Sequence, residues 1–462
     1  MKNIVLCIAS LVLIGACHPN LMAQERSKPN IVIIVIDDLG WMDLGCQGNK
    51  RLHTPNIDRL ASKGMRFTDA YSAAPVCSPT RAAIMTGQAP ARLRLTNHIA
   101  GRDFTPKDAK LNEAASLDHL PLNATTIAQL LKAVGYVTGF IGKWHLAGQA
   151  GKKGLGQLKY YPEKRGFDFN LGGCALGGPP SFFDPYGIHN LPDRRKGEYL
   201  PDRLADEAVS FIRSHREKPF FLALWDYTVH WPMEAPKELI TKYEKRLGPG
   251  LKDARYGAMI EAMDAAVGRV LAALDEAKLT ENTLIIFTSD NGGFLGVADL
   301  RPLRAGKGYL YEGGIRVPMI VSWSGKIPQG SESNVPVISM DLFPTMLAAG
   351  GLKPAKDVPL DGENLMPILT KAGKLKRDAI YFHYPNYAWH GQNRLGGAIR
   401  ENAYMLIENF DDNSVELYDL EKDLSQTKNL AQQMPEKAAQ MTRRLQQWRL
   451  DTGAAMPTLR KK

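Results

Sequence analysis

The sequence contains few cysteines and, after its first residues, no long hydrophobic run. Five cysteines in 462 residues are too few for a disulfide-dense scaffold. Its 42 glycines and 29 prolines are too few for a collagen-like or low-complexity chain, and 44% hydrophobic residues argue against general disorder. Because no later stretch reaches the length of a membrane span, we expect no integral membrane segment. The length instead predicts one large core or two to three ordinary domains.

The charge balance is basic, with 58 Lys and Arg against 48 Asp and Glu and a formal net charge of +10. Such an excess favours polyanionic partners in general. The basic residues are nevertheless scattered along the chain rather than grouped in blocks, and no known nucleic-acid-binding motif accompanies them. We therefore expect no nucleic-acid partner.

The N-terminus is typical of an export signal. Met1 and Lys2 precede an apolar stretch at residues 4–16, which is too short to cross a bilayer. Two processing sites fit. Ile14-Gly15-Ala16-Cys17 resembles a bacterial lipoprotein box, which would end the signal at residue 16 and place a lipid anchor on Cys17. Cleavage after Ala23 would instead remove residues 1–23. Either way, the mature chain is expected to be periplasmic or secreted, or held at the surface as a lipoprotein.

Cleavage after Ala23 leaves Cys46, Cys77 and Cys174, an odd number of cysteines. In an oxidising compartment at most one pair of these can form, so at least one thiol has another fate. A buried free cysteine is the ordinary outcome. Sequence separation alone does not decide whether Cys46 and Cys174 form a disulfide.

Alternating strand and helix patterns predict an α/β fold. Residues 30–36 form a continuous β-branched run, as expected for a central parallel strand buried on both faces. Similar strands are predicted at residues 136–141, 219–225, 283–288 and 318–323, with helices at residues 126–133, 202–213 and 256–277 between them. This alternation favours a large, mostly parallel sheet between helices.

The pattern changes after about residue 360. Short strands are predicted at residues 379–383, 397–400, 404–408 and 416–419, with a turn at residues 411–413 and a final helix at residues 436–448. Strands that follow one another so closely favour an antiparallel sheet. We therefore expect a small second sheet covered by the terminal helix.

Polar side chains follow two of the predicted parallel strands. Asp37 and Asp38 close the first strand, and Asp290 and Asn291 follow the strand that ends near Ser289. Open α/β sheets bind ligands at this edge. Three carboxylates and one amide oxygen form a ligand set suited to Ca²⁺ or Mg²⁺. Taken singly, each pair also reads as a strand terminator or a tight turn.

Residues 77–87 predict a short helix with a cysteine at its N-terminus. Ser78 is a good N-cap, Pro79 fits the first helical position, and Gly87 fits the position after the helix. The exposed N–H groups and positive dipole end of a helix favour an anionic nucleophile and an anionic ligand. Arg81 lies in the first turn and can point to the same place, so Cys77 is a candidate reactive cysteine.

The segment Cys77-Ser78-Pro79-Thr80-Arg81 resembles the signature of type I sulfatases, whose Cys-x-Pro-x-Arg cysteine is oxidised to formylglycine by a maturation enzyme. The resemblance covers nearly the whole mature chain. It includes Asp37-Asp38, Thr54 to Asp58, Gly142 to His145, Val229 to Pro232, Ser289 to Gly292, Gly306 to Gly308, Glu312 to Pro318 and Met340 to Thr345. It implies an alkaline-phosphatase-like α/β sandwich at residues 28–355 and a smaller C-terminal α+β unit at residues 356–462.

The resemblance also implies a metal and a nucleophile. One Ca²⁺, with Mg²⁺ the weaker alternative, would be held by Asp37, Asp38, Asp290, Asn291 and the modified Cys77. The aldehyde made from Cys77 would hydrate to a geminal diol, and one hydroxyl would attack the sulfur atom of a sulfate ester.

Further roles follow from the same resemblance. Arg81 and Lys143 would hold the formylglycine and the sulfate, placing fixed positive charge where negative charge moves. His230 and Lys307 would contact the sulfate and help to protonate the leaving oxygen. His145 would take the proton from the remaining hydroxyl, which expels sulfate and restores the aldehyde.

The expected substrate is an O-sulfated carbohydrate, such as a fragment of a glycosaminoglycan or an algal galactan. Residues 92–102 and 387–394 are rich in groups that bind sugars: Trp389 could stack on a sugar ring, and Arg394 could pair with a second anionic group. Two alternatives stay open. A related phosphodiesterase or phosphonate-ester hydrolase could use the same modified cysteine, and a non-catalytic glycan-binding protein would result if Cys77 were never oxidised.

Overall fold

A computed structural model describes residues 28–99, 104–149, 151, 154–354, 358–389 and 392–460. The expected signal, with its two cleavage sites and Cys17, lies outside the described residues. Within the described part of the chain, no helix is long and apolar enough to cross a membrane.

An eight-stranded sheet forms the centre of the molecule, in the order β10-β2-β9-β8-β1-β7-β5-β6. Strand β1 pairs in parallel with both β7 and β8, and all seven of its residues are buried because helices cover both faces. Only β9 runs antiparallel to its neighbours β2 and β8. In sheet order the strands are Ser331–Ser333, Met65–Phe67, Met319–Ser322, Thr283–Ser289, Asn30–Ile36, Phe220–Trp225, Val137–Gly142 and Phe169–Leu171. The predicted large, mostly parallel sheet is confirmed.

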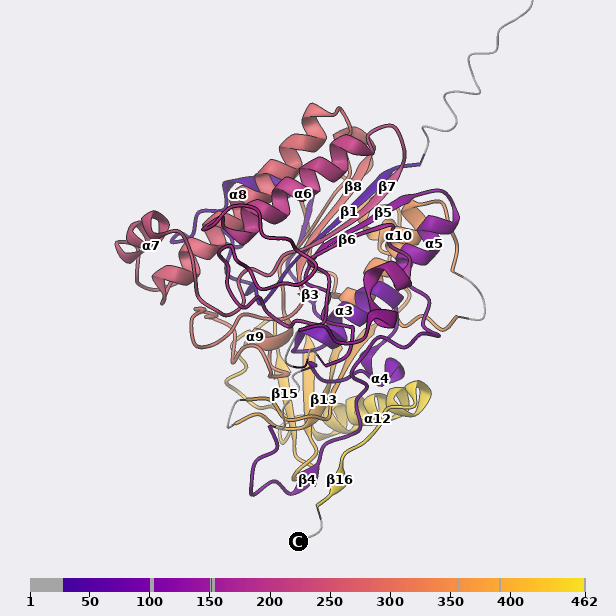
Figure 1. The fold of residues 1–462 in the computed structure, drawn as a ribbon. Helices are drawn as coiled ribbons and strands as arrows, with labels where there is room; N and C mark the ends of the chain where they lie inside the picture. Colours follow the sequence, from indigo (N-terminus) through magenta and orange to yellow (C-terminus); the bar gives the residue numbers. More distant parts are fainter. Residues whose placement is uncertain are drawn as a thin grey trace, which may run out of the picture.

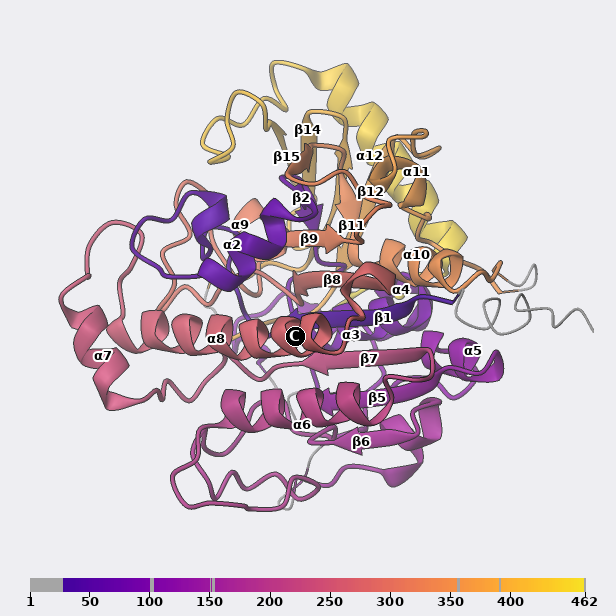
Figure 2. The ribbon, with the colours of Figure 1, turned by 90° about the horizontal axis from the view of Figure 1, so that it is seen from above.

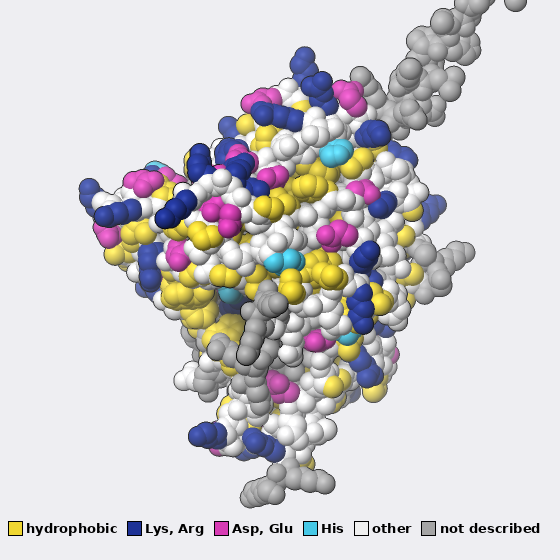
Figure 3. All heavy atoms as spheres, viewed as in Figure 1, with side chains coloured by type: hydrophobic (Ala, Val, Ile, Leu, Met, Phe, Trp, Pro, Cys, Tyr) yellow, Lys and Arg dark blue, Asp and Glu magenta, His cyan; other side chains and the backbone are white. Residues whose placement is uncertain are grey.

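Helices cover the sheet on two sides. Figure 1 shows α6 and α8 on one face and α3, α5 and α10 on the other, and Figure 2 gives the same layers from above. The helices are α2 (Pro55–Ser62), α3 (Cys77–Thr86), α4 (Pro90–Leu93), α5 (Ile127–Ala133), α6 (Leu200–Ser214), α7 (Lys237–Glu244), α8 (Ala254–Glu276), α9 (Glu312–Ile315), α10 (Leu342–Ala349), α11 (Met366–Leu369) and α12 (Pro435–Thr452). On the face that Figure 3 draws, Lys and Arg are interspersed with Asp and Glu over α6, α7 and α8.

A second sheet lies at the lower end of the molecule in Figure 1. It contains β12 (Ala379–Tyr384), β13 (Gly396–Glu401), β14 (Tyr404–Asn409) and β15 (Val415–Asp419), all antiparallel. Helix α12 packs Met441 and Leu445 against Ile399 and Leu406 of this sheet. The predicted strands, turn and terminal helix are therefore confirmed, while the boundary between residues 355 and 356 stays a prediction. Two-residue strands complete the fold: β3 (Ala70–Tyr71), β11 (Val337–Ile338), β4 (Leu111–Asn112) and β16 (Thr458–Leu459).

Helix α3 begins two residues earlier than the sequence predicts. Its N-cap is the extended residue Val76, so the assignment of Ser78 as N-cap is wrong. The Ser78 hydroxyl instead accepts a hydrogen bond from the backbone N–H of Ile99 at 3.2 Å, because a tertiary partner replaces the local one. Gly87 ends the helix at φ +70, as expected.

Candidate active site

Four neighbouring parallel strands deliver most of the predicted site residues. Strands β8, β1, β7 and β5 are adjacent in the sheet, so their carboxyl ends share one edge. The residues that follow these ends include the predicted set: Asp290 and Asn291 after β8, Asp37 and Asp38 after β1, His230 after β7, and Lys143 and His145 after β5. Helix α3 adds Cys77 and Arg81, and the loop before α9 adds Lys307.

The carboxylates of Asp37, Asp38 and Asp290 converge. One oxygen from each lies within 4.8 Å of the others, and all three residues are buried. The Oδ1 atoms of Asp37 and Asn291 are buried without a hydrogen-bond partner among the described residues. Unpartnered buried oxygens are costly unless a cation satisfies them, so this donor set fits a hard metal ion. The sulfur of Cys77 lies 3.2 Å from His145 Nδ1, and the role of the modified residue as a metal ligand stays a prediction.

Three cations surround the acidic group. Lys143 Nζ lies 2.6 Å from Asp37 Oδ2, Lys307 Nζ lies 2.6 Å from Asp38 Oδ1, and Arg81 Nη2 lies 2.8 Å from Asp290 Oδ2. Arg81 is held further by its Nη1, which donates to the Lys143 carbonyl at 2.6 Å. All these side chains are buried or nearly so, which strengthens each interaction relative to water.

Burial and the surrounding charges shift the pKa values of the three aspartates in different directions. Burial opposes ionisation of Asp38, but Lys307, His230 and Lys143 outweigh it and lower its pKa. Burial also opposes ionisation of Asp290, and Arg81 and Lys143 outweigh it in the same way, lowering that pKa. At Asp37, burial prevails and raises the pKa. A carboxylate in this position needs further positive charge to remain ionised.

His145 faces the candidate nucleophile. Its Nδ1 lies 3.2 Å from Cys77 Sγ, and its Nε2 lies 3.1 Å from the carbonyl oxygen of Ile99. Because a carbonyl only accepts, Nε2 carries the ring proton and Nδ1 presents its lone pair to residue 77. Burial, then Lys143, holds the pKa of His145 well below its usual range. His145 is therefore a neutral proton acceptor in this arrangement.

His230 has a different environment. Its Nδ1 donates to the Trp231 carbonyl at 2.9 Å, which leaves Nε2 as an acceptor 3.9 Å from Asp38 Oδ2. Burial and the nearby Lys307 lower the pKa of His230 to about 3. Burial opposes the charge on Lys307, but Asp38 outweighs it and raises the pKa of that amine. Of these two groups, Lys307 carries the proton in the free protein.

A cavity of about 740 Å³ opens above these groups, with Cys77, His145, His230 and Lys307 in its lining. Aromatic rings form one continuous wall of this cavity: Phe104, His98, Trp389, Phe294 and Trp231 follow one another with ring centroids 5.1 to 6.4 Å apart. We call these five side chains the aromatic wall. Trp389 lies there as expected.

Sequence reasoning missed Phe104, Phe294 and Gln149 as cavity residues. The one available signal was Phe294, a large apolar side chain just after the polar Asp290-to-Gly293 segment. Arg394 does not line the cavity, because it pairs with Asp411 at 2.7 Å and Asp412 at 2.6 Å. Among the described residues Cys46, Cys77 and Cys174 are free thiols, so Cys46 and Cys174 are not paired with each other.

Comparison with known proteins identifies the family of this chain. The family model described as Sulfatase matches residues 29–352, and a second, described as N-sulphoglucosamine sulphohydrolase, C-terminal, matches residues 305–451. N-acetylgalactosamine-6-sulfatase of Mus musculus is 33% identical over 411 residues, covering 82% of this chain and 72% of that protein. Steryl-sulfatase of Rattus norvegicus is 34% identical over 478 residues, covering 84% and 79%.

Solved structures of other proteins also match the fold of this chain. The crystal structure of Ps i-CgsB in complex with k-i-k-neocarrahexaose has a TM-score of 0.78 and 32% identity, covering 92% of this chain and 93% of that chain. The fold and the matched families thus define a hydrolase of anionic esters built on a large, mostly parallel sheet. This chain belongs to the sulfatase family, whose members hydrolyse sulfate esters.

Proposed function

We propose that this protein hydrolyses O-sulfate esters of sulfated saccharides with a nucleophile made from Cys77. The observation that carries the proposal is the placement of Cys77 at the N-terminus of a fully buried helix, with the neutral Nδ1 of His145 at 3.2 Å. A maturation enzyme would oxidise the Cys77 thiol to formylglycine, whose hydrated aldehyde supplies the attacking hydroxyl.

The acidic group is proposed to hold one Ca²⁺. Asp37, Asp38, Asp290 and Asn291 supply the hard oxygen donors, and the unpartnered Oδ1 atoms of Asp37 and Asn291 support their use as ligands. When bound, the ion supplies Lewis-acid polarisation of the sulfate oxygens and orients the nucleophile. Mg²⁺ is the weaker candidate, because it demands stricter octahedral geometry.

The protein's own cations and bases complete the proposed mechanism. Arg81 and Lys143 place buried positive charge beside residue 77, where negative charge moves during sulfate transfer. Lys307 holds the proton that the leaving oxygen needs, and His230 can accept a hydrogen bond at Nε2 because its Nδ1 donates to the Trp231 carbonyl. His145 receives a proton at Nδ1 while the Ile99 carbonyl fixes its ring orientation.

A saccharide is the substrate class that the cavity supports best. The aromatic wall presents flat apolar faces on which sugar rings stack, next to the cations that would bind a sulfate. Overall identity does not decide the substrate, because relatives named for a sugar and for a steroid match equally well. The complex of Ps i-CgsB with neocarrahexaose supports the saccharide.

We also propose export and a two-unit organisation. Removal of residues 1–23, or of residues 1–16 with lipid attachment at Cys17, would deliver a periplasmic, secreted or surface-anchored enzyme, where sulfated polysaccharides are encountered. The catalytic unit would comprise residues 28–355, followed by the smaller unit of residues 356–462.

The deciding experiment measures sulfate release by protein co-expressed with a formylglycine-generating enzyme. Position-defined sulfated monosaccharides and oligosaccharides are the substrates, with a matched phosphodiester as the competing class. We expect sulfate release by the wild type and none by Cys77→Ala at an unchanged melting temperature. Faster phosphodiester turnover would favour the phosphodiesterase. An intact Cys77 thiol after co-expression, seen by peptide mass spectrometry, together with saccharide binding, would favour a non-catalytic role.

A further inference from the structure

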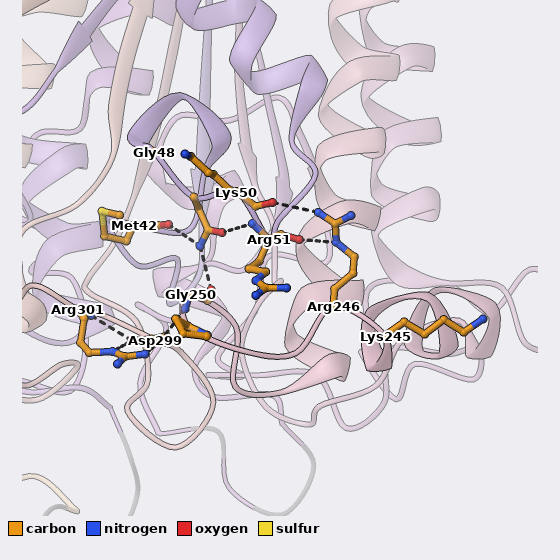
Figure 4. Close-up of a pocket in the computed structure, with 11 residues that line it drawn as sticks. Met42, Gly48, Lys50, Arg51, Lys245, Arg246, Gly250, Asp299 and Arg301 are labelled. Atoms are coloured by element: carbon orange, nitrogen blue, oxygen red, sulfur yellow. Dashed lines mark hydrogen bonds and ion pairs between the residues drawn. The ribbon is translucent and has the colours of Figure 1, made fainter.

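A second cavity, of about 830 Å³, lies outside the active site and shares no lining residue with it. Its walls come from three segments: the loop after β1, the end of α7 with the turn that follows it, and the loop at residues 299–301. Figure 4 shows these segments meeting around Arg51 and Gly250. A volume of this size is typical of a ligand site.

The lining of this cavity is strongly basic. It contains a single carboxylate, Asp299, and five cations: Lys50, Arg51, Lys245, Arg246 and Arg301. Asp299 is already engaged, since it accepts from Arg301 Nε at 2.8 Å and from the Gly250 N–H at 2.9 Å. Within the described ranges, none of the other four cations pairs with a carboxylate. Like charges that lie close together repel one another and destabilise the folded state, so a bound anion would stabilise this cluster.

Hydrogen bonds fix the backbone at the floor of the cavity. Asn49 is 7% exposed, and its amide nitrogen donates to the carbonyls of Met42 at 3.0 Å and Gly250 at 2.9 Å. Arg246 Nε donates to the Arg51 carbonyl at 2.7 Å, which fixes the backbone that carries Arg51. The Arg51 guanidinium lies against Gly248, where an added Cβ would come within 3.0 Å of it. In Figure 4, Arg51 extends into the space between Gly250 and Arg246, while Lys245 points away.

The two cavities are neighbours across one loop. Phe294 lines the active-site cavity, and Asp299 and Arg301 of the same loop line the basic one. A second connection runs over Trp231, an exposed member of the aromatic wall: the Arg255 guanidinium lies 5.9 Å from its ring centroid, just after the turn that contains Gly250. Arg255 itself pairs with Asp253 at 2.6 Å, so the exposed ring of Trp231 lies beside the segment that joins the basic cavity to α8.

We infer that the basic cavity binds a second sulfate group of the same substrate chain, on a sugar that is not being hydrolysed. This inference rests on the proposed function, because a polymer that brings one sulfate ester to Lys307 and His230 carries others along its length. The planar fork of Arg51 matches the geometry of a sulfate oxyanion. Arg246 adds positive charge to the same cavity, while its Nε and Nη2 donate to the Arg51 and Lys50 carbonyls. The enzyme thus prefers sulfated oligosaccharides to sulfated monosaccharides.

The test compares Lys50→Gln/Arg51→Gln with a matched control, Lys218→Gln/Lys374→Gln, which removes the same charge from two exposed sites outside both cavities. Substrates are a sulfated hexasaccharide and a monosaccharide that carries the same cleavable sulfate. We expect KM for the hexasaccharide to rise about fivefold in the first variant at unchanged kcat, because solvent-accessible ion pairs are each worth little. KM for the monosaccharide should stay the same, and high salt should remove the difference.

Three outcomes would overturn the inference. If the wild type hydrolyses the hexasaccharide and both double variants have the same KM for it, the basic cavity is not a sulfate site, and the proposed function stands. A wild type that releases sulfate from no saccharide removes the proposed function and this inference together. Finally, an oligonucleotide that binds Cys77→Ala more tightly than the hexasaccharide does, and loses that binding with Arg51→Gln, would reassign the cavity to nucleic acid.

Discussion

The Nδ1 atom of His145 points at the Sγ atom of Cys77 from 3.2 Å, while the carbonyl of Ile99 holds the opposite ring nitrogen. This relationship fixes which nitrogen can accept a proton. The positive φ of His145, +55, shows that the backbone adopts an uncommon conformation to present the ring in this way.

Substitution of His145 by alanine should therefore lower kcat about 10²–10⁴-fold with a small change in KM, since a lost proton acceptor slows the chemistry rather than binding. The measurement is steady-state sulfate release, with peptide mass spectrometry to establish that residue 77 is modified to the same extent. His53→Ala, at an exposed histidine, serves as the control. Equal kcat in the two variants would refute the role of His145.

Calcium should stabilise the fold through Asn291. Its Oδ1 is an unpartnered buried oxygen, and its Nδ2 donates to Asp38 Oδ1 at 2.8 Å, so Asn291→Leu removes a ligand and loosens a second one. A ligand at 100 times its Kd stabilises by about 2.7 kcal/mol. We expect added Ca²⁺ to raise the melting temperature of chelator-treated wild type, and to raise that of Asn291→Leu much less.

The control for this measurement is Asn112→Leu, at an exposed asparagine of β4. A calcium-dependent shift of the same size in both variants would exclude Asn291 as a ligand. Mg²⁺ at the same concentration should produce a smaller shift than Ca²⁺ in the wild type.

The sequence predicted those parts of the site that follow from strand ends. Residues 30–36 are apolar and β-branched on both faces, so their burial and the edge position of Asp37 and Asp38 followed directly. The antiparallel direction of β9 and the three-residue strands β2, β6 and β10 were not predictable, because so short a segment becomes a strand only through its partner.

Side chains whose position depends on distant loops were also missed. Phe104 and Phe294 are far apart in sequence and join the aromatic wall only through tertiary packing around Trp389. Arg394 illustrates the converse, because the turn at Asp411 and Asp412 supplies carboxylates that the local sequence around residue 394 does not reveal. Local pattern locates a charged residue but does not identify its partner.

Gly142 should be irreplaceable at the end of β5. It has φ +103, and an added Cβ would come 2.0 Å from the carbonyl oxygen of Trp225. That carbonyl accepts from the Lys143 N–H at 2.7 Å, so it cannot move without displacing a site residue. We expect Gly142→Ala to lower the free energy of unfolding by more than about 4 kcal/mol, as measured by denaturant titration.

Gly135 provides the matched control for Gly142. Its φ is +92, but an added Cβ would meet nothing within 4 Å, so Gly135→Ala isolates the backbone strain. That strain should cost about 1–2 kcal/mol. Similar destabilisation by the two substitutions would show that the contact with the Trp225 carbonyl is unimportant.

His383 should make the protein less stable in acid. The side chain is buried in β12, its Nε2 lies 2.8 Å from the Ala455 carbonyl, and burial with the nearby Arg449 lowers its pKa from 6.5 to about 4. Because the unfolded chain then binds more protons between pH 6.5 and 4, stability is fully present above pH 6.5 and falls as the pH drops through this window. The loss is on the order of 3 kcal/mol.

His383→Gln tests this directly, because glutamine retains a donor for the Ala455 carbonyl but does not titrate. We expect the free energy of unfolding, measured by urea titration at a series of pH values, to fall less steeply between pH 6.5 and 4 in this variant than in the wild type. The exposed-site variant His53→Gln should follow the wild-type curve. Parallel curves for all three proteins would mean that burial of His383 does not account for the acid sensitivity, and would direct attention to the carboxylates instead.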